Sequence, residues 1–183
     1  AEGLDNPRML AVADDGTVYV TQRTPGNLVM LRDTDGDGIA DIQKIVFRQA
    51  QLHGIPIRGG EIFLADIKTV YAGDILPNGR IGPPRIVTAG LPDGGQHPNR
   101  TLAFSPDGEL FVSVGSTCNE CGEPNPQHAT LQRMSDEPER SRPDKPARRE
   151  MFASGLRNSL GFGWHPGSGR LYAFDNGIDW LGN

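Results

Sequence analysis

One short loop of the sequence carries residue types that suit a metal ion. From Asp33, aspartates stand at positions 1, 3, 5 and 9 and a glycine stands at position 6. This spacing is typical of an EF-hand-type calcium loop, where a backbone carbonyl supplies position 7. The predicted ligands are Asp33, Asp35, Asp37, Ile39 (through its carbonyl) and Asp41. Lys44 replaces the usual bidentate Glu and the flanks read as strands, so we expect a structural Ca²⁺ inside a β-hairpin. A solvated acidic turn is the alternative.

A second group of chemistry-bearing residues lies in loops that precede alternating strands. His97 stands in the loop 91–102, and Arg157 with Asn158 in the segment 154–162. A neutral imidazole can accept a proton, and a guanidinium can stabilise developing negative charge. Both loops enter an alternating strand in the same way, so we expect them to meet at a common site. The alternatives are an ordinary surface His97, and an Arg157–Asn158 pair that only bonds neighbouring loops.

The two cysteines form the run Cys118-Asn-Glu-Cys121. Two cysteines are too few for a disulfide scaffold or a four-cysteine zinc site, and Gly122 excludes a c-type haem attachment. We interpret the pair as a local disulfide, which predicts a periplasmic or secreted protein.

The elements that must position these residues are read from four hairpins. Gly16, Gly60, Gly108 and Gly169 each close a turn between two alternating strands. Further short strands follow the first two hairpins, so each unit has about four strands in roughly 40–50 residues, the period of a propeller blade. The sequence predicts an all-β chain with no helix. A small β-sandwich is the alternative.

The domain prediction is one partial β-propeller over residues 1–183, with about three to three and a half four-stranded blades. Residues 117–149 read as a polar insertion in the third blade. Because this number of blades does not close a ring, we expect the remaining propeller blades as a partner and read the chain as an N-terminal half.

Composition excludes two classes of protein. The net charge is −5 and no run of Lys or Arg occurs, which argues against nucleic-acid binding. The apolar stretches are too short for a membrane span.

At this point the sequence resembles a known family, the soluble glucose/sorbosone dehydrogenases. The resemblance rests on Ala89-Gly-Leu-Pro, His97, Arg100, Ser105-Pro-Asp-Gly-Glu-Leu-Phe-Val-Ser-Val-Gly115, Gly155-Leu-Arg-Asn-Ser-Leu-Gly-Phe162 and Asp175-Asn-Gly-Ile-Asp179. The acidic loop and the run Val114-Gly-Ser-Thr-Cys-Asn-Glu-Cys121 are similar to the sorbosone/pyranose dehydrogenase branch. The resemblance implies a six-bladed propeller that uses pyrroloquinoline quinone (PQQ) and Ca²⁺.

The resemblance also implies roles for single residues. His97 would take the proton of a sugar hydroxyl while hydride passes to the quinone, and Arg157 would polarise the quinone oxygens. Asn158 and Arg100 would contact the cofactor, and the backbone carbonyls of Gly177 and Ile178 would hold the active-site Ca²⁺.

The sequence departs from the family at three points. His97 and Arg100 are three residues apart, whereas some members of the family space them by four. Ser159 stands where the family often has Pro, and the basic residues that grip the cofactor carboxylates lie in later blades of the family. We therefore expect the chain alone to be inactive.

The leading functional prediction is a PQQ-dependent oxidoreductase acting on a sugar or a sugar-derived alcohol or aldehyde, with an external electron acceptor. One alternative is a Ca²⁺-dependent lactonase-type propeller with ligands from Asp175, Asn176 and Asp179. The other is a non-catalytic, Ca²⁺-stabilised propeller that binds carbohydrate or protein.

Overall fold

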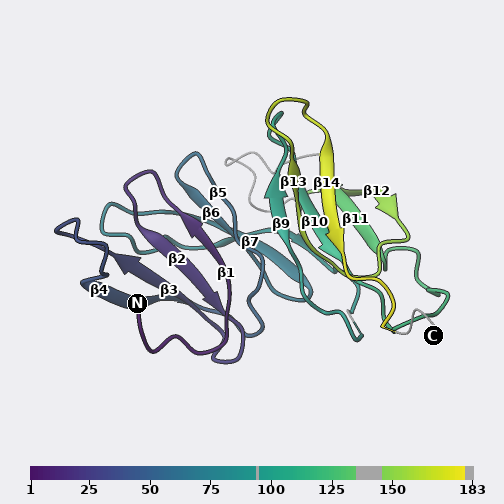
Figure 1. Ribbon diagram of the computed structural model, residues 1–183, viewed down its shortest axis with the longest axis horizontal. Coiled ribbons are helices and arrows are strands. Elements are labelled where there is room, and N and C mark those ends of the chain that lie inside the picture. The colour runs from purple at the N-terminus through teal and green to yellow at the C-terminus, as the bar shows by residue number, and fades with distance from the viewer. Residues whose placement is uncertain (94, 135–145, 180–183) are drawn as a thin grey trace. The chain divides into compact units, whose positions relative to one another are not determined.

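The computed structural model describes residues 1–93, 95–134 and 146–179, and every regular element in them is a β-strand (Figure 1). The strands are β1 (Pro7–Val12), β2 (Val18–Gln22), β3 (Asn27–Arg32), β4 (Ile42–Arg48), β5 (Ile57–Arg58), β6 (Glu61–Ala65), β7 (Thr69–Asp74), β8 (Arg85–Ala89), β9 (Leu102–Phe104), β10 (Leu110–Val114), β11 (Thr130–Met134), β12 (Arg149–Ser154), β13 (Ser159–Trp164) and β14 (Leu171–Asp175). Within these ranges no helix could cross a bilayer.

The strands form four sheets in which neighbours along the chain pair with each other. Three sheets have four strands, in the orders β1-β2-β3-β4, β5-β6-β7-β8 and β12-β11-β10-β9, and β13-β14 is a two-stranded sheet. The pairs within the first and third sheets are antiparallel. The predicted all-β class and the four-stranded blades are confirmed.

The four predicted glycine turns are also confirmed. Gly16, Gly60, Gly108 and Gly169 have φ of 82°, 76°, 91° and 64°, and each lies in the turn that joins the first two strands of a sheet. A residue with a side chain is strained in this left-handed conformation, which explains why glycine recurs there.

The chain divides into two compact units, residues 1–66 with 70–86 and residues 67–69 with 87–183. In the first unit, one apolar cluster joins side chains of the first and second sheets, including Tyr19, Leu28, Ile62 and Leu64. The buried Tyr19 hydroxyl donates to the carbonyl of Gly79 at 2.9 Å. This hydrogen bond satisfies the one polar atom that the ring brings into the core.

In the second unit, the third sheet packs on the β13–β14 pair through aromatic rings. The Phe111 ring of β10 lies edge-on to the Trp164 ring of β13 at 5.0 Å, and edge-on at 5.1 Å to the Phe152 ring within its own sheet. Thr101 donates through its hydroxyl to the carbonyl of Leu160 at 2.9 Å. These contacts fix the two sheets that carry the candidate site.

A blade strand lies within residues 117–149, the segment that the sequence predicts as a polar insertion in the third blade. β11 lies within it and pairs with β10 and β12. Its Gln132 is buried because the side-chain amide donates to the Gln127 carbonyl and the Thr130 hydroxyl, so polar residues could hide a core strand. Residues 135–145 of this segment lie outside the described residues.

Candidate active site

Three loops of the second unit meet at one end of their sheets. The first precedes β9, the second joins β10 to β11, and the third joins β12 to β13. The amide of Gln96 donates to the carbonyl of Thr117 at 3.0 Å, and the amide of Ser116 donates to the carbonyl of Arg157 at 2.7 Å. The middle loop therefore holds the loop of His97 and the loop of Arg157 together.

Two glycines permit this close approach. A Cβ at Gly115 would lie 2.5 Å from the Cβ of His97 and 3.4 Å from the carbonyl oxygen of Arg157. A Cβ at Gly95 would lie 2.5 Å from the carbonyl oxygen of Thr117, and Gly95 also has a φ of 50°. The two distances of 2.5 Å are too short for real atoms, so the loops can pack here only without these side chains.

Contacts to Ser116 define which nitrogen of His97 carries the proton. The Nδ1 of His97 lies 3.0 Å from the carbonyl oxygen of Ser116 and 2.9 Å from its Oγ. That hydroxyl donates its own hydrogen to the carbonyl of Cys118 at 2.7 Å, so it acts as an acceptor toward the ring. Two acceptors at Nδ1 require the Nδ1–H tautomer, which leaves the lone pair of the neutral ring on Nε2.

The Arg157 guanidinium is almost wholly engaged with two neighbouring loops. Its Nε donates to the carbonyl of Asn119 at 2.8 Å and its Nη1 to the carbonyl of Asn176 at 3.0 Å. Its Nη2 donates to Asn119 Oδ1 at 2.5 Å and to the Asp179 carboxylate at 3.1 Å. Four of the five N–H donors are thus used within the described residues, and one on Nη1 remains for a ligand.

Asp175 at the end of β14 shapes the loop that carries Arg157 and Asn158. Its carboxylate accepts the amides of Arg157 at 3.1 Å and Asn158 at 2.9 Å. The same carboxylate accepts the hydroxyl of Ser159 at 2.8 Å. The serine that departs from the family pattern therefore takes part in holding this loop.

The predicted carbonyl ligands Gly177 and Ile178 lie in a segment that is fixed on both sides. The Asn176 carbonyl accepts from Arg157, and the Asp179 amide donates to Asn119 Oδ1 at 3.1 Å. The carbonyls of Gly177 and Ile178 accept no hydrogen bond from the described residues. Two adjacent free carbonyls are oxygen donors of the kind that Ca²⁺ takes, so the segment fits that ion.

A small hollow lies at the meeting point of these loops. Its volume is about 210 Å³, and Ser116, Asn119, Arg157 and Ile178 are among its lining residues. Of the predicted site residues, Arg157 and Ile178 line this hollow, whereas His97 and Asn158 are not among its lining residues. A guanidinium donor and backbone carbonyls are groups of the kind that quinone oxygens and Ca²⁺ require, so these residue types fit the cofactor implied by the resemblance.

Arg100 differs from the expected cofactor contact. Its side chain is fully buried, and its guanidinium donates to backbone carbonyls. Those carbonyls belong to Ile67, Pro92, His97 and Asn99. A guanidinium without exposed surface cannot reach a ligand, so Arg100 instead braces the loop that presents His97.

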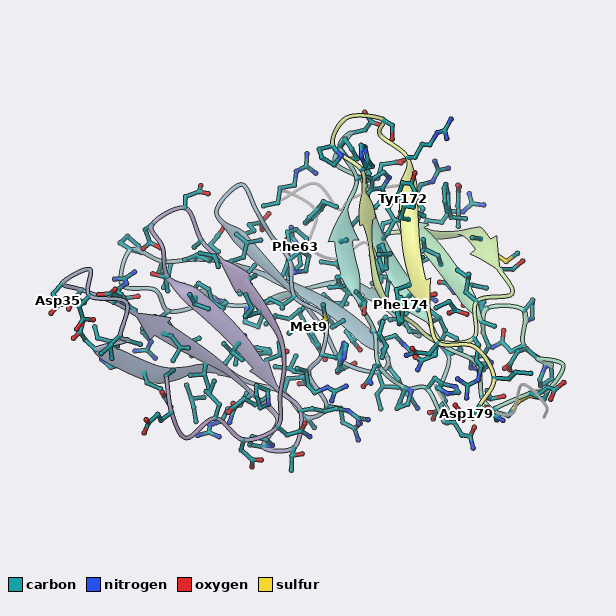
Figure 2. All side chains as sticks on the ribbon, viewed as in Figure 1. Met9, Asp35, Phe63, Tyr172, Phe174 and Asp179 are labelled. Atoms are coloured by element: carbon teal, nitrogen blue, oxygen red, sulfur yellow. A yellow bond between two sulfur atoms is a disulfide. The ribbon has the colours of Figure 1, made fainter. Side chains whose placement is uncertain are left out.

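The acidic loop between β3 and β4 lies in the first unit, and Figure 2 shows Asp35 at its tip. Carboxylate oxygens of Asp33, Asp35 and Asp37 lie within 4.8 Å of one another, and all three residues are exposed. The carboxylate of Asp41 does not join them, because it accepts the amide and the hydroxyl of Thr34, both at 2.6 Å. Three of the four predicted carboxylates are thus together.

Backbone amides within this loop donate to its carboxylates and favour their anionic form. Asp33 accepts the amides of Gly38 at 2.8 Å and Gly36 at 2.7 Å. These hydrogen bonds, that of Gly38 first, lower the pKa of Asp33 below its ordinary value. The hydroxyl and amide of Thr34 lower the pKa of Asp41 in the same way. Both side chains therefore stay anionic, as Ca²⁺ ligands must be.

The predicted disulfide joins Cys118 to Cys121. It closes the turn that carries Asn119, a residue that sequence reasoning missed. Ser116 and Gly115 were missed as well, although the small residues directly before Cys118 are a signal of close packing. No local pattern distinguishes an asparagine whose partners are 38 and 60 residues away.

The chain shares its fold with three solved proteins, two of which are named as PQQ proteins. The holo form of the pyranose dehydrogenase PQQ domain from Coprinopsis cinerea matches with a TM-score of 0.83 and 22% identity, over 98% of this chain and 46% of that chain. The calcium structure of the carbohydrate-active enzymes family AA12 protein from Trichoderma reesei matches with a TM-score of 0.85 and 25% identity, over 98% and 48%. The PQQ-bound aldose sugar dehydrogenase from Streptomyces coelicolor matches with a TM-score of 0.71 and 19% identity, over 98% and 59%.

The chain thus spans about half the length of the first two solved proteins it matches. No curated protein sequence matches it. The TrAA12-like family model, in contrast, matches all of residues 1–183. The chain therefore belongs to the TrAA12-like family.

Proposed function

We propose that the protein containing this chain is a quinoprotein oxidoreductase that oxidises a sugar or a sugar-derived alcohol or aldehyde. The observation that carries the proposal is the meeting of His97 and Arg157 on Ser116, with Nδ1 of His97 held as a donor. Membership of a family with solved relatives that bind PQQ supports the choice of cofactor.

Each residue has a proposed part in the reaction. PQQ, when bound, supplies the acceptor for the hydride of the substrate. His97 takes the hydroxyl proton of the sugar on Nε2, because its other nitrogen already donates to Ser116. Arg157 stabilises negative charge on a ligand oxygen through its remaining N–H, and the amide of Asn158 orients that ligand. The carbonyls of Gly177 and Ile178 hold the active-site Ca²⁺.

The lactonase-type alternative finds less support. It needs the carboxylates of Asp175 and Asp179 as metal ligands. Asp175 already accepts two backbone amides and a hydroxyl, and Asp179 pairs with Arg157 at 3.1 Å. Groups of three potential ligands in the described residues do not include either aspartate.

A second Ca²⁺ with a structural role is part of the proposal. Asp33, Asp35, Asp37 and the carbonyl of Ile39 would bind it, and Asp41 would join after releasing Thr34. The clustering of three carboxylates within 4.8 Å supports this site.

We also propose a periplasmic or secreted location, because a disulfide persists in an oxidising compartment. An external electron acceptor is the proposed partner that reoxidises the cofactor.

The test is sugar-dependent reduction of an artificial electron acceptor by the full-length protein, with and without added PQQ and Ca²⁺. Activity should require both additions. His97→Ala should lower kcat/KM by about 10²–10⁴-fold, the usual contribution of a general base, while PQQ and Ca²⁺ still bind.

The matched control is His165→Ala, because His165 is an exposed histidine in the β13–β14 turn. It should keep full activity. Hydrolysis of lactones without PQQ would replace the proposal with the lactonase-type alternative. Binding of carbohydrate with neither activity would favour the non-catalytic alternative.

A further inference from the structure

Asn119 lies between β10 and β11 and is hydrogen-bonded to two other segments of the candidate active site, one before β13 and one after β14. Its carbonyl and its Oδ1 both accept from the Arg157 guanidinium, at 2.8 Å and 2.5 Å. Its Oδ1 also accepts the amide of Asp179 at 3.1 Å. One side-chain oxygen thus ties the turn after β10 to the loop before β13 and to the segment after β14.

The position of Asn119 itself is fixed by covalent and polar contacts on both sides. The disulfide Cys118–Cys121 closes its turn. The Cys118 carbonyl accepts the Ser116 hydroxyl, the same group that accepts from His97. Glu123 accepts the amide and hydroxyl of Thr117, at 2.7 and 2.9 Å. The turn can therefore hold Asn119 with little freedom.

We infer that Asn119, on its disulfide-closed turn, is a positioning residue that aims the Arg157 guanidinium and sets the carbonyls of Gly177 and Ile178 at the metal position. The inference rests on the proposed function. With both ends of segment 176–179 bonded to Arg157 or Asn119, the backbone on either side of the two carbonyls is restrained. The bonds to Asn119, Asn176 and Asp179 together use four of the five N–H donors of Arg157 within the described residues, so the direction of the remaining Nη1–H depends in part on this turn.

The experiment compares Asn119→Ala, Asn119→Asp and the pair Cys118→Ser with Cys121→Ser in the full-length protein. The control is Asn125→Ala in the same loop, where the removed side-chain oxygen accepts the local amide of Gln127. The first readout needs neither cofactor nor activity: hydrogen exchange of the Asp179 amide and of the Arg157 Nε–H by NMR.

Asn119→Ala should speed exchange at Asp179 by roughly tenfold or more, and the cysteine pair should act in the same direction. Asn119→Asp keeps an acceptor oxygen and should restore slow exchange. Asn125→Ala should leave exchange unchanged. Unchanged exchange in Asn119→Ala would overturn the inference whether or not the protein oxidises sugars, and unchanged exchange in the cysteine pair would remove the disulfide from it.

The second readout is steady-state kinetics with PQQ and Ca²⁺. Misaligned groups cost up to about 10²-fold, so Asn119→Ala should lower kcat by roughly 10- to 100-fold with a smaller change in KM. Asn119→Asp should not regain kcat, because its added negative charge offsets the guanidinium that it holds in place. A normal kcat together with fast exchange in Asn119→Ala would overturn the positioning role.

Discussion

Ser116 sets the protonation pattern of His97 through two oxygens of one residue. In the neutral ring, 15N chemical shifts should show Nδ1 protonated and Nε2 bare, because both oxygens act as acceptors toward Nδ1. Ser116→Ala removes one of the two acceptors and should increase the share of the other tautomer, with a several-fold loss of kcat. Nε2 protonated in the unsubstituted protein would contradict the proposed base.

The stability of the protein at acidic pH should depend on the backbone amides that donate to Asp33. Its folded-state pKa is lowered by Gly38 first and by Gly36 next. The carboxylate therefore adds stability above the ordinary aspartate pKa, and this part is lost as the pH falls through the lower folded-state value.

A 13C titration of the Asp33 carboxyl by NMR in Ca²⁺-free buffer measures this pKa. The midpoint should lie below the ordinary value of 3.8. Gly38 has a φ of 85°, so a substitution there would strain the turn as well. Asp33→Asn instead removes the titrating carboxyl and so identifies its NMR signal. A midpoint at or above the ordinary value would show that the amides do not bind the carboxylate in solution.

At the scale of elements, the loop before β9 can pack against the loop after β10 only because Gly115 has no side chain. Gly115→Ala should push the His97 loop outward, cost about 1–3 kcal/mol of stability as overpacking does, and reduce kcat. The control is Gly163→Ala in β13, where a Cβ would meet nothing within 4 Å. Thermal melts and kinetics check both variants, and equal effects at the two positions would contradict the close packing at Gly115.

The elements themselves were predictable where their cause is local. A glycine between two alternating strands predicts a turn, because only a residue without a side chain adopts a φ near 91°, as at Gly108, without strain. β11 was not predicted because its buried Gln132 is a polar residue. Its side-chain amide can be buried because it donates to the Gln127 carbonyl in the preceding loop. Arg100 was misread for the same reason, since one of its carbonyl partners, Ile67, lies 33 residues away along the chain.

The same reason divides the candidate site into predicted and unpredicted parts. His97 and Arg157 stand out by residue type and by their place before a strand. Asn119 does not, because what distinguishes it is the convergence of three loops that fold together only in space.

At the scale of the whole molecule, Ca²⁺ bound to the acidic loop should raise the melting temperature. An ion that binds only the folded chain adds about 2.7 kcal/mol when its concentration is a hundred times Kd. Excess chelator should therefore lower Tm, and Asp35→Asn should remove most of this response. A melting curve that chelator leaves unchanged would exclude the structural ion.

The exposed aromatic side chains of β14 should make the 183-residue chain associate. Tyr172 and Phe174 are 60% and 71% exposed and lie two residues apart on the same strand (Figure 2). Residues at this spacing share one face of a strand, so together they form an apolar surface. Sedimentation should show association that weakens when both residues are replaced by Thr. Val12→Thr on β1, also exposed, is the control, and equal association in all three proteins would contradict the prediction.

The turn between β13 and β14 has a practical value that follows from the antiparallel pairing. Arg157 precedes β13 and Asn176 follows β14, so the residues at Gly169 lie a full strand length from both. Exposed turns of this kind accept inserted sequence with little loss of stability. A peptide tag or a surface anchor spliced after Ser168 would leave the loops around Arg157 intact, and variation in length at this turn can accumulate without changing the chemistry.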